Sequence, residues 1–144
     1  MSALSIAPYF PFPRVIPVRQ RLTRDVAGEM YSEITFEAPR RPVCSGCGQP
    51  RRAIHSTTVR AVRDPPLAGV PVVLTLPLRK VRCPRCGVRT EQHEFLATYR
   101  RATVRFERAV AELCRVLPIK RLGWLLRNGT RHVSITQHDR RADA

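Results

Sequence analysis

The chain has 144 residues, which is enough for one ordinary domain or two small ones and leaves little room for a large catalytic domain. Its 26 Lys and Arg residues outnumber its 11 Asp and Glu residues, and the formal net charge of +15 favours a polyanionic partner, nucleic acid first. A membrane surface is the main competitor for this charge. It is disfavoured because no lipidation signal is evident in the sequence.

The N-terminal residues are not expected to act as a signal peptide. They lack a charged n-region, and their apolar residues are interrupted by Pro8, Pro11, Pro13 and Pro17. The longest apolar run, residues 65–78, also contains prolines and falls short of the ~20 residues that a membrane span needs. We therefore expect a cytoplasmic protein, associated with the nucleoid if DNA is its partner.

Residues 1–28 are rich in proline and arginine and have no sustained hydrophobic period. A segment of this kind predicts a flexible basic arm. Residues 29–97 are predicted to form a zinc ribbon-like DNA-binding domain. Its first strand is expected over residues 30–37, because Met30, Ser32, Ile34 and Phe36 fall on one face of an alternating pattern.

Two CxxC pairs mark this domain. Cys44 and Cys47 form the first pair, Cys83 and Cys86 form the second, and a glycine directly follows each pair. Glycine suits the tight, positive-φ turn by which two nearby thiolates wrap one ion. In a reducing compartment such pairs predict metal ligands rather than disulfides. We therefore predict one structural Zn²⁺ with these four cysteines as ligands.

The 35 residues between the two pairs are predicted to form two antiparallel strands. Residues 51–63 are rich in β-branched side chains, and residues 70–83 alternate in part between apolar and basic side chains. A turn is expected between the two stretches, at Pro65, Pro66 and Gly69. Two strands between two cysteine knuckles make a zinc ribbon.

Other interpretations of the cysteines stay open. CxxC is also a redox signature, although a thioredoxin-type motif follows a strand and opens a helix, whereas glycine and basic residues follow both pairs here. Four cysteines could also hold an iron–sulfur cluster, and His55 or His93 could replace one ligand. A catalytic zinc is disfavoured, because four cysteine ligands leave no coordination position for water.

The hydrophobic period changes in residues 98–129, which are predicted to be helical. Over residues 100–117 apolar side chains recur at steps of three and four, which predicts an amphipathic helix that ends at Pro118. A shorter helix is expected over residues 119–127. The two together suggest a partial helix-turn-helix, because the third helix that such a motif usually needs is not visible.

Residues 130–144 have no helical stripe and are predicted to be a disordered tail. Cys114 and Trp124 are expected to pack within the helical segment. The predicted fold class is therefore α+β, with a small β zinc ribbon followed by a partial helix-turn-helix and flexible termini.

Basic side chains gather near the two cysteine pairs and in the helical segment. Neutralising phosphates with such side chains releases counterions, which gives DNA affinity without sequence readout. The predicted DNA-binding residues are Arg51, Arg52, Arg79, Lys80, Arg82, Arg85, Arg89, Arg101, Arg105, Lys120 and Arg121. The contrary interpretation is that these charges only solvate a small surface.

Several short motifs occur in a defined order. They are Cys44-x-x-Cys47-Gly, Arg51-x-x-x-His55, Val62-Arg-Asp64-x-Pro66-x-x-Gly69-x-Pro71-Val72, Arg79-Lys-x-Arg-Cys83-x-x-Cys86-Gly and Leu117-Pro118-Ile119-Lys120-Arg121. This order resembles the N-terminal zinc-binding and helix-turn-helix region of ISL-three-type insertion-sequence transposases. The resemblance covers residues 40 to 121.

The resemblance implies a DNA-binding role. In that family the N-terminal domains bind the terminal inverted repeats of the element, and a longer RNase H-like domain carries three acidic residues that hold Mg²⁺. Here Asp25, Asp64 and Asp139 lie in a predicted arm, a turn and a tail, so no such catalytic site is expected.

The expected protein is thus a truncated transposase fragment that binds transposon-end DNA without catalytic activity. It could associate with a full-length transposase. The alternative function is a zinc-ribbon protein-interaction module, in which the positive charge serves solubility alone.

Overall fold

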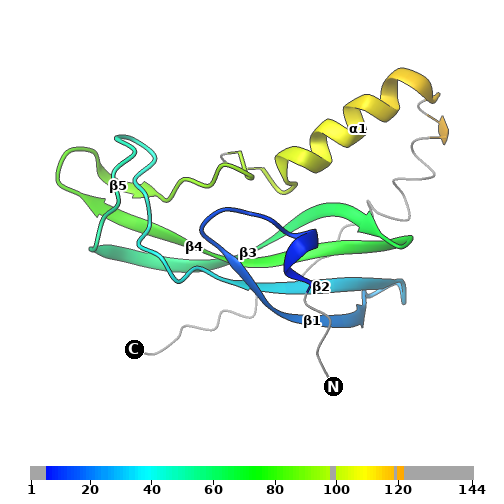
Figure 1. Ribbon diagram of the computed structural model, residues 1–144, viewed down its shortest axis with the longest axis horizontal. Coiled ribbons are helices and arrows are strands. Elements are labelled where there is room, and N and C mark those ends of the chain that lie inside the picture. The colour runs from blue at the N-terminus through cyan, green and yellow to red at the C-terminus, as the bar shows by residue number, and fades with distance from the viewer. Residues whose placement is uncertain (1–5, 98–99, 119, 122–144) are drawn as a thin grey trace.

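The computed structural model describes residues 6–97, 100–118 and 120–121. In chain order its elements are the short 3-10 helix η1 (Ala7–Tyr9), the strands β1 (Ile16–Arg24), β2 (Met30–Glu37), β3 (Ile54–Leu67), β4 (Val70–Cys83) and β5 (Gly87–Thr90), and the helix α1 (Val104–Val116). Over the described residues the protein is mostly β-sheet with a single α-helix (Figure 1). The predicted α+β class therefore overstates the helical content, and the described residues do not by themselves show a helix-turn-helix.

The strands form one sheet in the order β1-β2-β4-β3, and β5 pairs with β4. β3 runs antiparallel to β4 along nearly the whole strand. The other edge of β4 is divided, because its residues 72–75 pair in parallel with β2 and its residues 80–83 pair antiparallel with β5. β4 is therefore the strand on which both ends of the sheet are assembled.

The turn between β3 and β4 lies within the predicted turn region. Leu67 pairs with Val70, and the two residues between them, Ala68 and Gly69, both have positive φ angles, of 51° and 77°. Two central residues with positive φ define the tight turn whose twist matches an antiparallel hairpin. The register shifts between Asp64 and Leu67, where two prolines interrupt the ladder.

The main core lies between the sheet and two segments that cross it. From the sheet, Ile34, Phe36, Val62, Val72, Leu74, Leu76 and Leu78 are buried, and Phe10, Phe12, Val15, Phe95 and Leu96 cover them. Phe12 stacks on Phe95 with ring centroids 4.4 Å apart, and Phe10 meets Phe36 edge-on at 5.9 Å. These rings join the N-terminal segment to the rest of the molecule.

The predicted flexible arm is wrong for the described residues 6–24. Phe10, Phe12 and Val15 are buried in the core, and β1 pairs antiparallel with β2. The surrounding prolines restrict the unfolded chain, so ordering this segment costs less entropy than its irregular sequence suggests. β1 gave no alternating signal because it is an edge strand without a buried residue.

The helix α1 confirms the predicted amphipathic helix, and Thr103 caps its N-terminus by accepting a hydrogen bond from the backbone N–H of Phe106. It leaves the sheet at its first turn (Figure 1) and contains no buried residue. Cys114 is exposed instead of packed. The predicted second helix, apart from Lys120 and Arg121, and the predicted tail lie outside the described residues. No helix among the described residues is long and apolar enough to cross a membrane.

Leu74 tests the main core. It is fully buried, so Leu74→Ala should lower the free energy of unfolding by about 3 kcal/mol, through lost apolar burial and a residual cavity. The control Val59→Ala removes an exposed side chain and should change it by less than about 0.5 kcal/mol. Urea unfolding of the zinc-loaded chains measures both. Equal effects would show that this face of the sheet is not the core.

Candidate metal centre

The four predicted metal ligands come together at the far end of the β3–β4 hairpin. Cys83 is the last residue of β4, and Cys86 directly precedes β5. Cys44 and Cys47 lie in the segment between β2 and β3, where Val43 pairs with Pro50 in a short antiparallel bridge. The strand order thus delivers both knuckles to one place.

The sulfur atoms have the spacing of a four-thiolate zinc site. All four Sγ atoms lie within 4.8 Å of one another, and those of Cys47 and Cys83 are 3.7 Å apart. A regular tetrahedron with Zn–S distances of about 2.3 Å has sulfur atoms about 3.8 Å apart. The cysteines therefore fit one structural zinc ion whose coordination sphere they complete.

Glycines make the two knuckles possible. Gly48 and Gly87 follow the second cysteine of each pair with φ angles of 72° and 77°, a left-handed conformation that other residues adopt at a cost. Gly46 is required for space, because a Cβ atom there would lie 2.7 Å from Sγ of Cys86. The Gly48 N–H donates to the Cys44 carbonyl over 2.9 Å, which closes the first knuckle.

The site also prepares one thiol for the metal. Arg51 Nη2 donates to Sγ of Cys47 over 3.3 Å. This hydrogen bond, with a further one from the backbone at Gln49, lowers the pKa of Cys47 to about 6. Cys47 is therefore a thiolate at neutral pH, which is the form that binds metal.

The pKa values of Cys83 and Cys86 are shifted in opposite directions. Burial opposes ionisation of Cys83, but the backbone N–H groups of Arg85 and Cys86 keep its pKa below the ordinary value. Burial and then the neighbouring thiols raise the pKa of Cys86 to about 12. Four thiols at this spacing can ionise together only if a cation balances them, so a divalent ion fits the chemistry of the set.

A buried polar network supports the first knuckle, and no motif in the sequence predicts it. Glu91 accepts hydrogen bonds from the backbone N–H and the guanidinium of Arg79, at 2.9 Å to 3.1 Å. Burial raises the pKa of Glu91, but His93, 3.5 Å away, and Arg79 outweigh it and hold the pKa at about 2. The backbone of Glu91 bridges to that of Cys44, so this network fixes the knuckle against β4.

The two histidines considered as ligands are not part of the metal site. His93 is buried against Phe95 and Glu91, and His55 is exposed beside Ser56. Among the described residues the four cysteines alone make up the metal-ligating cluster. The spare cysteine, Cys114, lies on α1.

The eleven residues predicted to bind DNA fall into three structural groups. Arg51, Arg79 and Arg105 are committed to internal partners, namely Cys47, Glu91 and Asp64, and are therefore poorly suited to phosphate contacts. Five others are exposed around the metal centre: Arg52, Lys80, Arg82, Arg85 and Arg89. Arg101 precedes α1, and Lys120 and Arg121 follow it, all exposed.

A cysteine pair tests the metal centre. Cys83→Ser should lose the zinc ion and the hydrogen-exchange protection of the knuckle amides, because zinc-binding free energy is folding free energy in a small metal domain. The matched control is Cys114→Ser, which removes the exposed thiol of α1 and should keep one zinc per chain. Zinc analysis and hydrogen exchange give the answer. Zinc retained in Cys83→Ser would exclude the four-cysteine site.

Arg51 tests the electrostatics of the same site. When the pH is below the pKa of Cys47, this thiol carries a proton that zinc must displace. The zinc affinity then falls about tenfold for each unit by which the pH lies below that pKa. Arg51→Met should raise this pKa toward the ordinary value of 9.0, and zinc should bind about tenfold more weakly at pH 7, with the difference shrinking by pH 9.

Chelator competition at several pH values measures the affinity. Arg52→Met, which removes the adjacent exposed charge, is the control. A loss that is the same at every pH, or the same in both variants, would argue against the role of Arg51.

Comparison with known proteins agrees with this geometry. Residues 40–86 match the family described as the zinc-finger of transposase IS204/IS1001/IS1096/IS1165. The chain is also similar to the transposase for insertion sequence element IS1001 of Bordetella parapertussis, with 42% identity over 72 residues. That alignment covers 49% of this chain but spans 18% of the relative. No solved structure matches the chain.

The matched range contains both cysteine pairs and the β3–β4 hairpin between them. Both comparisons agree with the resemblance drawn from the motifs. Residues 40–86 of this chain are therefore similar to the zinc finger of these insertion-sequence transposases.

Proposed function

We propose that this chain is the zinc-dependent DNA-binding part of an insertion-sequence transposase, and that it recognises transposon-end DNA without carrying out catalysis itself. The observation that carries the proposal is the distribution of charge around the metal centre. The similarity to the IS1001 transposase, whose length the chain spans by less than a fifth, supports it.

The segment from residue 38 to residue 90 contains one acidic residue, Asp64. The same segment contains ten arginines and one lysine: Arg40, Arg41, Arg51, Arg52, Arg60, Arg63, Arg79, Lys80, Arg82, Arg85 and Arg89. Eleven positive charges and one negative charge give it a formal net charge of +10, which four thiolates and one Zn²⁺ would lower to +8. Because the side chain of Asp64 is buried and paired with Arg105, it does little to offset this charge at the surface. Such a surface attracts a polyanion and releases its counterions.

The exposed strand positions at the zinc end suit phosphates. Lys80 and Arg82 lie on the same side of β4, because side chains alternate along a strand. Ser56 of β3 and Thr90 of β5 both pair with Lys80. Hydroxyl and basic side chains together are the usual ligands of DNA phosphates and sugars. This face of β3, β4 and β5 is the proposed phosphate-contacting surface.

The helical segment is the second part of the proposal. We infer that α1 is the first helix of a partial helix-turn-helix, in which Lys120 and Arg121 begin the next helix. Exposed cations lie before and after α1, at Arg101 and at Lys120 and Arg121. Terminal inverted repeats are the proposed DNA partner, a full-length transposase is a second one, and the nucleoid of the cytoplasm is the proposed location.

A zinc-ribbon protein-interaction module is the second candidate function. Exposed apolar side chains near the metal centre favour it: Ile54 and Val88 are 46% and 51% exposed. In this case any binding to DNA would be weak and would not depend on the cations of β4. The two functions therefore differ in how binding responds to salt.

Neutralising two cations of β4 tests the proposed surface. Each phosphate contact contributes about 0.9 to the slope of log affinity against log salt, so Lys80→Gln combined with Arg82→Gln should reduce that slope by about 1.8. The control combines Arg19→Gln with Arg24→Gln on β1 and has the same net charge.

Titration of the zinc-loaded chains against inverted-repeat DNA and against scrambled DNA, at 50 and 200 mM salt, provides the slopes and the specificity. A slope reduced equally by both pairs would show attraction by total charge alone. Salt-insensitive binding would favour the interaction module.

A further inference from the structure

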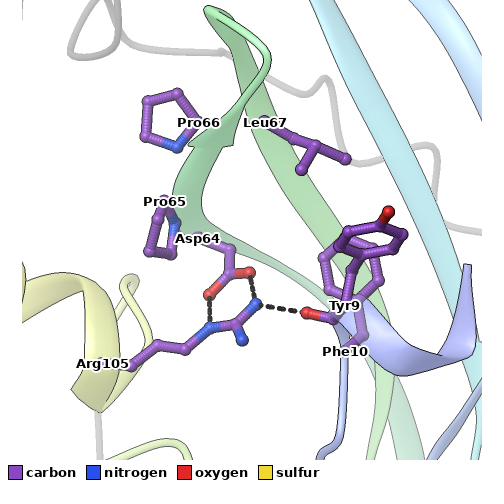
Figure 2. A pocket seen from close by; sticks show the side chains of 7 residues that line it. All are labelled: Tyr9, Phe10, Asp64, Pro65, Pro66, Leu67 and Arg105. Atoms are coloured by element: carbon purple, nitrogen blue, oxygen red, sulfur yellow. Dashed lines mark hydrogen bonds and ion pairs between the residues drawn. The ribbon is translucent and has the colours of Figure 1, made fainter.

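Arg105, predicted as a DNA contact, is instead directed toward the body of the protein. Its Nε donates to Oδ1 of Asp64 over 2.8 Å, and its Nη2 donates to Oδ2 of the same carboxylate. Figure 2 shows this two-pronged pair at the end of β3. The side chain of Asp64 is 1% exposed and that of Arg105 is 38% exposed. A carboxylate so deeply buried needs a partner of opposite charge, because leaving it unpaired is costly.

The same guanidinium also contacts the N-terminal segment. Nη2 of Arg105 donates to the backbone carbonyl of Tyr9 over 3.1 Å (Figure 2). The guanidinium carbon lies 4.6 Å from the ring centroid of Phe12 and 5.7 Å from that of Phe10. These distances are within the range of cation–π attraction. Arg105 therefore contacts a residue that lies 96 positions earlier in the sequence.

A third link connects the pair to the start of α1. The Thr103 hydroxyl donates to Oδ1 of Asp64 over 2.8 Å, while its oxygen accepts from the N–H of Phe106 over 3.3 Å. The hydroxyl that caps the helix is thus fixed by the same carboxylate. On the backbone, Thr103 N–H donates to the Arg63 carbonyl and Arg63 N–H donates to the Arg101 carbonyl, so the entry to α1 extends the edge of the sheet beside β3.

The shallow hollow beside this pair belongs to the same junction. It has a volume of about 240 Å³ and is lined by Tyr9, Phe10, Asp64, Pro65, Pro66, Leu67 and Arg105. Figure 2 shows the prolines of β3 on one side of it and the N-terminal aromatic residues on the other. The described structure thus brings the N-terminal segment, β3 and the helix entry together around one ion pair.

We propose that Arg105 is a positioning residue that couples the docking of residues 6–15 to the start and direction of α1. A lysine would not serve equally well, because one ammonium group cannot reproduce the planar fork that holds both carboxylate oxygens and still reaches the Tyr9 carbonyl. Coupling between two segments is reciprocal, so loosening either one must loosen the other. This inference does not depend on the proposed DNA partner.

Hydrogen exchange of the zinc-loaded chain tests the coupling. In Arg105→Met the amides of Phe12, Thr103 and Glu107, which report on the N-terminal segment and the helix entry, should exchange at least about tenfold faster. The amides of Cys44 and Arg82, which report on the zinc end, should keep their rates. The control Arg108→Met removes the same charge from an exposed position one turn along α1 and should change none of them.

Two further variants keep the test decisive if Arg105→Met does not fold. Phe10→Leu removes a ring near the guanidinium and leaves every side chain of α1 in place. It should still speed exchange at the amide of Glu107 by about threefold, because losing a weak cation–π contact changes an equilibrium by about that factor. Arg105→Lys should recover only part of the protection. The proposal is overturned if Phe10→Leu leaves Glu107 unchanged, or if Arg105→Met affects α1 but not Phe12.

Discussion

The structure depends on one strand that is buried on both of its faces. Along β4 the buried positions include Val72, Leu74, Leu76 and Leu78 in the first part, and Val81 and Cys83 in the second. Because side chains alternate along a strand, these two sets point to opposite sides. The first set is part of the main core. The second set belongs to a small cluster with the other three metal ligands, Cys44, Cys47 and Cys86. β4 therefore contributes side chains to both the metal centre and the main core, and connects the two.

Some basic side chains of this protein pair with groups inside the fold, and others are exposed to solvent. Arg79 and Arg105 each neutralise a buried carboxylate, and Arg51 supports the Cys47 thiolate. Their charges are used inside the fold because a buried anion without a partner is costly. The cations that stay exposed around the metal centre are those that can meet a polyanion. The number of basic residues alone therefore overstates the proposed phosphate-contacting surface, because arginines with internal partners do not belong to it.

The sequence predicted the parts of the fold whose signals are local. Two CxxC pairs followed by glycine predicted the zinc ligands, because the geometry of a knuckle is set within five residues. The alternation of residues 70–83 and the turn at Gly69 predicted the hairpin, and steps of three and four predicted α1. The N-terminal segment carried no such signal, since Phe10 and Phe12 pack against residues that are distant in sequence and β1 is an edge strand.

By itself, then, the sequence determined the metal and its four ligands, the β3–β4 hairpin, the amphipathic helix and the excess of positive charge. Only the tertiary structure decided the roles of individual charges. The sequence does not distinguish an arginine that pairs with Asp64 or Glu91 from an arginine that is exposed to solvent. The tertiary structure also decided that the proline-rich N-terminal segment is part of the core, and that Arg105 joins this segment to α1. Local spacing predicts a ligand set, whereas ion pairs between distant residues exist only after the chain has folded.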